Sequence, residues 1–508
     1  MTVKAFTLLV TAALLLSVPG TVLGKESGCA ECHGDKDMAE SARVPAEMFT
    51  GDAHDKAGLT CADCHGGDPD TTDFLKAHGK ADGFRSRPKE KEIVSLCSGC
   101  HGSEERMKAF GVEEPDVSQV AKFHSSVHGQ IDPVEGFEIP TCASCHGPHG
   151  IRPPEDPLSS VHPTKVPELC SRCHTDLAYM RAFTSARVRV DQMIEYKTSV
   201  HGMRIAEGDT KVAVCSSCHG SHDILRASNP NSRVHPLNVA ATCGQCHSDA
   251  AYMKGYFVER LRGQRVPMPT NQQASYERSV HHAALTEKGD LSAPTCNDCH
   301  GNHGATPPQV RVVAHVCAEC HSRPAELYEG SELRAEFDKS GHPHCATCHG
   351  NHEIVRPGTS LLADLAKGAT PTGWRPEEKW RKMTAGFQSS ITDLSRRLDE
   401  AEALVARVEN YGMDLTRARL KLNQAQDGLV RSRVSVHAFD PARLAELTEG
   451  TEDEVGSLAL IAQATTLAEE ALAERSYRRY GLGVALVIIA FLMTMLILKI
   501  RQMEAGGG

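Results

Sequence analysis

The chain has 508 residues, a formal net charge of −10, and low contents of hydrophobic (40%) and aromatic (5%) residues. This length is sufficient for two or three domains, but these side chains alone would make only a thin core over most of the chain. The negative charge argues against nucleic acid as a partner, and the sequence has neither a phosphate-binding glycine loop nor a dinucleotide fingerprint.

Residues 1–24 have the composition of a secretory signal peptide. Lys4 provides a positive start, residues 6–18 are apolar, and residues 22–24 have small or modest side chains suited to cleavage after Gly24. An uncleaved membrane anchor is the alternative, although this apolar stretch is short for a membrane span. We therefore expect residues 25 onward to be exported.

All 20 cysteines fall in ten Cys-x-x-Cys-His motifs. This motif is the attachment signature of c-type haem, in which two thiols bind the porphyrin and the adjacent histidine binds iron. A disulfide framework would not require these histidines, and zinc knuckles have no fixed histidine at this position. The sequence therefore predicts ten covalently bound haem c groups. The attachment residues are Cys29, Cys32, Cys61, Cys64, Cys97, Cys100, Cys142, Cys145, Cys170, Cys173, Cys215, Cys218, Cys243, Cys246, Cys296, Cys299, Cys317, Cys320, Cys345 and Cys348, and the proximal iron ligands are His33, His65, His101, His146, His174, His219, His247, His300, His321 and His349.

The motifs repeat along the chain. Cys97, Cys170 and Cys243 are 73 residues apart, and Cys317 follows 74 residues later. Five units result, each with an odd-numbered motif, a histidine of Ser-x-His type and an even-numbered motif. In the last four units a trailing histidine lies seven residues after the first cysteine of the even motif.

Each unit thus offers two motifs and two additional histidines, which is the ligand number for two irons with histidine on both faces. In unit one Asp68 stands where the trailing histidine is expected, and His78 is the substitute. The sequence does not assign distal histidines to individual haems, and His282 and His344 are rivals of their neighbours. The predicted distal ligands are His54, His78, His128, His149, His201, His222, His281, His303, His342 and His352.

The other histidines have weaker claims. His162 and His235 each stand in a Val-His-Pro segment, where they could replace a ligand or hydrogen-bond a haem propionate. His124, His315 and His437 are treated as background. Iron with two imidazole ligands has no open site, so such haems transfer electrons at mostly low potential, as in anaerobic respiration. No catalytic residue is predicted.

The cysteines end at Cys348, and residues 357–479 have helical patterns. The seven-residue pattern predicts a helical hairpin or coiled-coil-like region that packs and spaces the haem domain, with a stalk or docking surface as the functional alternative. Asp440 and Pro441 predict the start of another helix, and Thr451 begins a further one that could continue into the membrane. The apolar positions of the pattern are Ile391, Leu394, Leu398, Ala401, Val405, Val408, Leu415, Leu422 and Leu429.

Residues 480–500 form an apolar stretch long enough for one membrane-spanning helix, followed by a cytoplasmic tail at 501–508. A buried core helix is the alternative. Basic residues flank both ends, so the positive-inside rule gives no clear orientation. The expected export of the motif region instead places the chain in the inner membrane with its haem domain in the periplasm.

The expected fold is mostly α and irregular. It combines a haem-filled multihaem cytochrome c domain of five dihaem units (25–356), long α-helices (357–479) and one C-terminal transmembrane helix (480–500).

At the level of the repeat the chain resembles the multihaem c-type cytochromes, in particular the decahaem electron-conduit cytochromes of metal-reducing bacteria. The resemblance covers residues 29 to about 356, and rests on the count of ten and on the segments CASCHGPHG (142–150) and CNDCHGNHG (296–304). It implies distal ligation by Ser-x-His and Pro-His-Gly histidines, carried over to His128, His149, His201, His222, His281, His303, His342 and His352.

The tail departs from that family, because outer-membrane conduits have no transmembrane helix. Quinol-oxidising membrane cytochromes usually carry their anchor at the N-terminus, so they match only in part. The long helices and terminal anchor are also similar to enzymes of the hydroxylamine oxidoreductase type, whose haem number and pattern differ.

Three functions are therefore compatible with the sequence. The favoured one is a carrier that transfers electrons between a quinol-linked inner-membrane partner and periplasmic or outer-membrane acceptors. The second is an oxidoreductase acting on a small nitrogen or sulfur compound at one five-coordinate haem, with unit one the suspect. The third is a haem-wiring subunit of a larger respiratory complex.

Overall fold

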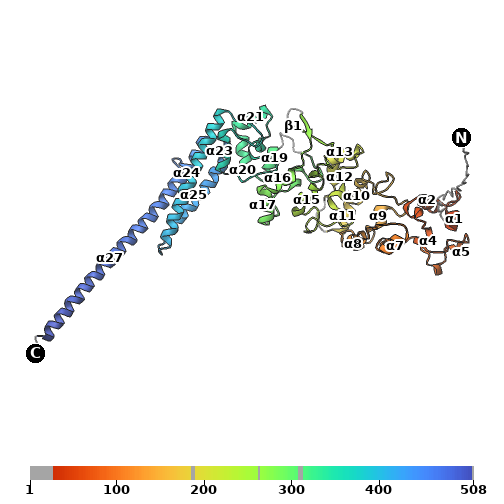
Figure 1. The fold of residues 1–508 in the computed structure, drawn as a ribbon, viewed down its shortest axis with the longest axis horizontal. Helices are drawn as coiled ribbons and strands as arrows, with labels where there is room; N and C mark the ends of the chain where they lie inside the picture. Colours follow the sequence, from red (N-terminus) through yellow and green to blue (C-terminus); the bar gives the residue numbers. More distant parts are fainter. Residues whose placement is uncertain (1–26, 185–188, 261–263, 307–312, 506–508) are drawn as a thin grey trace, which may run out of the picture. The chain divides into compact units, whose positions relative to one another are not determined.

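The computed structural model describes residues 27–184, 189–260, 264–306 and 313–505. The expected signal peptide, residues 1–24, lies outside them. The chain has two compact units, which are Met1–Thr242 with Gly301–Thr306, and Cys243–His300 with Pro307–Gly508. As expected, the fold is mostly helical, with short helices separated by irregular segments before long helices at the end of the chain (Figure 1).

The motif region contains short helices and one hairpin. Its helices are α1 (Gly28–His33), α2 (Glu40–Phe49), α3 (Ala53–Lys56), α4 (Cys61–His65), α5 (Phe74–Ala77), η1 (Lys80–Asp82), α6 (Glu90–His101), α7 (Glu104–Ala109), α8 (Ser118–Ser125), α9 (Cys142–His146), α10 (Val166–His174), α11 (Leu177–Phe183), α12 (Gln192–Thr198), α13 (Val200–Ala206), α14 (Cys215–His219), α15 (Pro236–His247), α16 (Gln272–Glu277), α17 (Val280–Glu287), α18 (Cys296–His300), α19 (Val313–Ala318), α20 (Ser322–Glu329), α21 (Glu332–Ser340) and α22 (His344–His349). The unpredicted hairpin pairs β1 (Phe257–Arg260) with β2 (Gln264–Pro267), antiparallel, with Val258 opposite Val266.

Odd and even motifs differ in local structure. Most odd motifs end longer helices, such as α6 and α10, whereas the first four even motifs are five-residue helices and the fifth lies in α22. In α9 the Thr141 amide donates to Ser144 Oγ (2.9 Å), which caps the short helix. The glycine after each even motif has positive φ, for example Gly147 at 81°, and so turns the chain sharply toward the trailing histidine.

After the last motif the chain forms a helical bundle. Its elements are α23 (Thr359–Lys367), α24 (Glu378–Glu409), α25 (Thr416–Ser435), η3 (Val436–Ala438), α26 (Pro441–Thr448) and α27 (Ser457–Ala505). Helices α24, α25 and α27 contact one another pairwise (Figure 1). The nine apolar positions of the seven-residue pattern are all buried in one cluster with Leu460, Ile461, Ala464 and Ala468 of α27. The helical part is therefore a bundle of three long helices in which α27 completes the α24–α25 hairpin.

The helix starts expected in the tail are half right. Asp440 Oδ1 accepts from the Ala442 amide (2.9 Å) and caps α26, as predicted. The last helix begins at Ser457 and not at Thr451, because Thr451 closes a turn with Glu454. The Thr451 amide donates to the Glu454 carbonyl (2.9 Å), and the Glu454 amide donates to Thr451 Oγ1 (3.1 Å).

Helix α27 also carries the apolar stretch of 480–500. Among the described residues it is the single helix long and apolar enough to cross a membrane. Its first turns are buried in the bundle, while its side chains from Tyr477 to Met503 are exposed, as a membrane anchor requires. The second half of α27 extends beyond α24 and α25 (Figure 1).

A second apolar cluster joins the tail to the fifth unit. Tyr328, Leu333 and Phe337, from helices α20 and α21, pack with Trp374 and Trp380 of the tail. Trp380 Nε1 donates to the Glu336 carboxylate (2.6 Å). The tail is therefore packed against the last haem-motif unit through large aromatic side chains.

We predict that Leu398→Ala lowers the free energy of unfolding of the tail bundle by about 2–5 kcal/mol, because it leaves a cavity in the buried cluster. Leu420→Ala, at a side chain that is 57% exposed, should change it by less than about 0.5 kcal/mol. Urea unfolding of the detergent-solubilised chain, followed by circular dichroism, measures both. Equal sensitivity would contradict this packing.

Candidate haem sites and their histidine pairs

The two motifs of a unit begin beside each other. In unit two the side chain of Cys97 lies against that of Cys142, within hydrogen-bonding distance. The same thiol contact joins the odd and even motifs of units three, four and five: Cys170 with Cys215, Cys243 with Cys296, and Cys317 with Cys345. The attachment points of two haems are therefore adjacent within a unit.

Each even-motif histidine of the first four units faces the trailing histidine of the next unit. The ring centres are 5.9–6.0 Å apart and the ring planes are 7–15° from parallel. The pairs are His65 with His149, His146 with His222, His219 with His303, and His300 with His352.

The odd-motif histidines face a different class of partner. In three pairs the second ring is the histidine at the Ser-x-His position of the preceding unit, where Asp52 replaces the serine before His54, and in unit one it is His78. The ring centres are 6.1–6.2 Å apart, but the planes are tilted by 35–81°. The pairs are His33 with His78, His101 with His54, His174 with His128, and His321 with His281.

This spacing fits an iron between the rings. Two metal–imidazole bonds of about 2 Å each, plus the part of each ring between its nitrogen and its centre, separate two ring centres by about 6 Å. The donor set, with two cysteines beside one histidine of each pair, is the one that covalent haem c requires.

Hydrogen bonds and burial prepare the imidazoles for iron. His65 Nδ1 is 2.9 Å from the Arg85 carbonyl and His78 Nδ1 is 2.9 Å from the Phe74 carbonyl. A proton on Nδ1 donates there and leaves Nε2 for the metal. Burial, helped by His174, lowers the pKa of His128 to about 4, so the ring is neutral at physiological pH.

The serine of Ser-x-His has a local purpose. Ser199 is fully buried, and its Oγ accepts from the Gly202 amide (2.8 Å). This bond caps α13, in which His201 is the second residue. Ser279 caps α17 in the same way, with the His282 amide as donor (3.2 Å). The cap fixes the first helical turn, and hence the direction of the histidine.

A repeated backbone hydrogen bond interlocks consecutive units. The residue before each Ser-x-His-type histidine donates its amide to the carbonyl two residues after the trailing histidine of the next unit. The four bonds are Ala53 to Ile151 (2.8 Å), Val127 to Ile224 (2.9 Å), Val200 to Ala305 (3.1 Å) and Val280 to Ile354 (2.8 Å). Histidine pairs and backbone bonds thus connect the same neighbours.

The order of these pairs explains the irregular first unit. Every trailing histidine faces the even motif of the preceding unit, and in this sequence no Cys-x-x-Cys-His motif stands before Cys29. Asp68 therefore does not replace a missing ligand, and His78 faces the odd motif of its own unit, at His33.

The rival histidines are separated by their contacts. His281 faces His321 at 6.2 Å, whereas His282 packs edge-on against Tyr276 at 5.4 Å. His344 is buried, with Nδ1 2.9 Å from Tyr328 Oη and Nε2 3.4 Å from Asp338 Oδ1, so both of its nitrogens are engaged.

The Val-His-Pro histidines lie in local turns. His162 is buried, and its Nδ1 is 2.8 Å from Thr164 Oγ1. His235 is also buried, and its Nδ1 accepts from the Leu237 amide (3.3 Å).

Two further histidines change places relative to the sequence prediction. His342 packs against Phe337 (5.7 Å) and Trp374 (6.3 Å) and is not brought to a motif histidine in its described ring contacts. His437, which was treated as background, instead faces His349 of the last motif with ring centres 6.0 Å apart and planes 14° apart. No repeat or cysteine marks His437, so only its lone position in a helical segment could have drawn attention.

Known proteins match this site in part. The cytochrome c3 family model matches residues 53–175. Over 200 residues, which is 38% of this chain, the sequence is 26% identical to the multiheme cytochrome MtrA of Shewanella baltica (strain OS185). The match spans 43% of that relative's length. No solved structure gives a significant match.

Ten attachment motifs, histidine pairs spaced for iron and the match to cytochrome c3 together define the class. These findings support a multihaem c-type cytochrome with covalently bound haem c. Its C-terminal apolar helix fits a membrane anchor.

We predict that Val280→Pro weakens the interlock between units four and five by at least about 1 kcal/mol, because it removes the amide donor to Ile354 (2.8 Å) and places the ring Cδ against that carbonyl. Proline is tolerated at the first helical position, and Ser279 is already extended (φ −81°, ψ 159°). High-spin iron should therefore appear at lower urea concentration in the optical spectrum. Val280→Ala keeps the donor and is the control, and equal responses of both variants would refute a role for the bond.

Proposed function

We propose that this chain is a membrane-anchored, periplasmic decahaem electron carrier. It transfers electrons between a quinol-linked partner in the inner membrane and periplasmic or outer-membrane acceptors. The observation that supports it best is the pairing of motif histidines with second histidines at iron-binding distance in both classes of motif. Two imidazoles fill both axial positions of an iron, so its chemistry is electron transfer.

The repeat extends this ligand set. His201 has the repeat position of His128 and His281, both of which face motif histidines. We therefore assign it as an axial ligand. Motif cysteines in contact within a unit, and histidine pairs between units, support a path that runs through every unit.

A substrate-reducing haem has no support in unit one. Both of its motif histidines have a histidine partner: His33 faces His78, and His65 faces His149. The argument that made unit one a suspect, the aspartate at position 68, therefore loses its basis. A wiring subunit of a larger complex uses the same haem path, and differs only in having permanent partners.

The helical end supports the location. Covalent haem is attached outside the cytoplasm, and the exposed apolar half of α27 suits one membrane span. A chain anchored in this way in the inner membrane has its haems in the periplasm, where a membrane partner and soluble acceptors can both reach them. One span offers little to bind a quinol, so the quinol chemistry belongs to a partner protein.

We predict ten haems per polypeptide, all low-spin, when the oxidised protein is measured by haem assay and low-temperature EPR with spin quantification. The low-spin signals should fall in two groups, since the electronic anisotropy of ferric iron depends on the angle between its two imidazole planes. These angles are 7–15° in the even class and 35–81° in the odd class.

A high-spin signal of about one spin per protein would overturn the carrier assignment. In that case an enzyme acting on a small nitrogen or sulfur compound becomes the better reading, and such compounds should be tested as oxidants of the reduced protein.

We further predict that protease added to spheroplasts degrades the haem domain and leaves a membrane-bound fragment containing the end of α27. In inside-out membrane vesicles from the same cells the haem domain should be protected. A quinol should reduce the haems only in membranes that contain the partner, and reduction of the purified protein at the same rate would show that no partner is needed.

A further inference from the structure

We propose that His437, in the helical tail, is the distal iron ligand of the last motif, Cys345–His349, and that the tail thereby closes the haem chain. This inference rests on the proposed function, because it assumes that every motif binds a haem with two histidine ligands. The sequence prediction counted His342 among the distal ligands without assigning it to a haem, and treated His437 as background.

The geometry of this pair is that of the even class. The rings of His349 and His437 are 6.0 Å apart and 14° from parallel. The four other even motifs give 5.9–6.0 Å and 7–15°. In those four the second ring comes from the next unit. The fifth unit is followed by the helical tail, and the tail supplies the equivalent ring.

The His437 ring is prepared as a ligand. Its Nδ1 is 2.8 Å from the Val434 carbonyl, to which it donates, and Nε2 is left for iron. His437 lies in η3, between α25 and α26, where two helices fix the backbone on both sides.

His342 has no equivalent geometry. Histidines at its repeat position face the odd motif of the following unit, and no sixth motif unit follows the fifth. Its described ring contacts are with Phe337 and Trp374 instead. The repeat therefore explains why this histidine is left over at one end, just as it explains Asp68 at the other.

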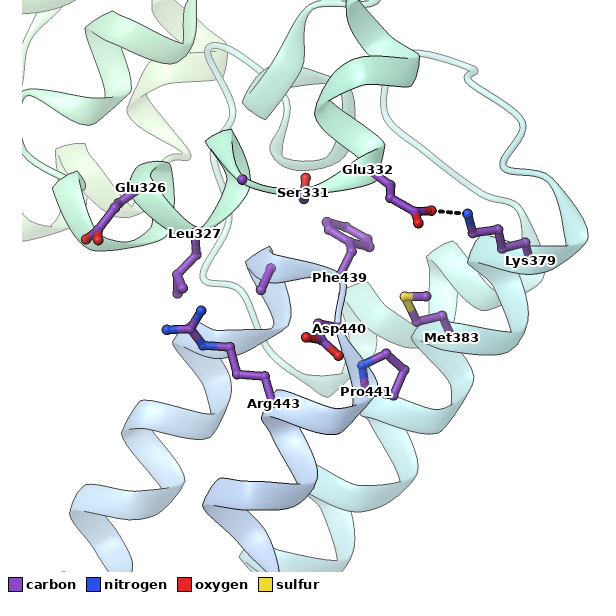
Figure 2. A pocket seen from close by; sticks show the side chains of 12 residues that line it. Glu326, Leu327, Ser331, Glu332, Lys379, Met383, Phe439, Asp440, Pro441 and Arg443 are labelled. Atoms are coloured by element: carbon purple, nitrogen blue, oxygen red, sulfur yellow. Dashed lines mark hydrogen bonds and ion pairs between the residues drawn. The ribbon is translucent and has the colours of Figure 1, made fainter. Parts of the chain in front are cut away.

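The turn after His437 has a strained backbone that neighbouring side chains stabilise. Phe439 has φ +49°, the one positive value for a residue other than glycine in the described chain. Such a conformation costs a bulky residue energy and persists where the surroundings impose it, often at functional sites. Phe439 packs edge-on against Trp380 (5.6 Å). It lies with Ser331 and Met383 along one pocket, between the fifth unit and the tail (Figure 2).

An ion pair spans the same pocket. Lys379 of α24 binds Glu332 of α21, and both residues line the pocket with Phe439 (Figure 2). The tail and the fifth unit are thus joined by an apolar cluster, by ionic contacts and, in this proposal, by a metal–ligand bond.

The test compares His437→Ala with His342→Ala in the full-length, detergent-solubilised protein. His437→Ala should convert one of the ten irons to high spin in the EPR spectrum. After reduction it should bind about one equivalent of carbon monoxide, and added imidazole should restore the low-spin signal. His342→Ala should stay low-spin and bind no carbon monoxide.

The opposite result, or two unchanged variants, would overturn the proposal. A wild-type protein with an open haem would instead refute the proposed function, so the two failures are distinguishable.

A second variant is needed in case His437→Ala loses its haem during maturation. His437→Met keeps a ligand, and a histidine–methionine pair raises the reduction potential of iron. A redox titration should therefore show one haem shifted upward and nine unchanged. His342→Met is the matched control, and a shift there but not in His437→Met would assign the ligand to His342.

Discussion

The histidine pair that holds one iron is the constraint on which the rest of this chain depends. Side chains in the motif region bury few large apolar groups, so packing alone would fix little. A pair of rings about 6 Å apart fixes two chain segments that are distant in sequence. Since nearly all pairs join one unit to the next, the same contacts that would hold iron also determine the order of the units.

The two classes of pair follow from two ways of presenting histidine. In the even class, the motif histidine ends a very short helix, and the trailing histidine follows a glycine turn such as that at Gly147. In the odd class, His101 and His174 end the longer helices α6 and α10, and in another pair His281 stands in the first turn of α17, which Ser279 caps. Because the backbone positions the rings differently in the two classes, the angles between the ring planes differ. Both classes recur along the chain with the repeat.

The sequence predicts what is local, and misses what depends on register between units. Cys-x-x-Cys-His is complete within five residues, so the attachment sites can be predicted without knowledge of the fold. The seven-residue pattern around Leu398 predicts burial because helix periodicity is local too. The partner of each ring was open because the repeat fits pairing within a unit as well as between units. His437 was missed because its role depends on tertiary packing of the tail, which no motif or spacing records. The strained Phe439 and the turn at Thr451 have the same origin.

The interlocking of neighbours also limits how such a chain can change in length. A unit cut out at its own boundaries would leave its neighbours with surplus and orphaned imidazoles, unless a whole repeat of 73 residues were removed in phase. The same constraint applies to growth by duplication. An inserted repeat brings two distal histidines for its two haem motifs, and the pairs at the two ends, which involve His78 and the tail, are unchanged. Wires of different length could therefore be built from one module while the end pieces remain constant.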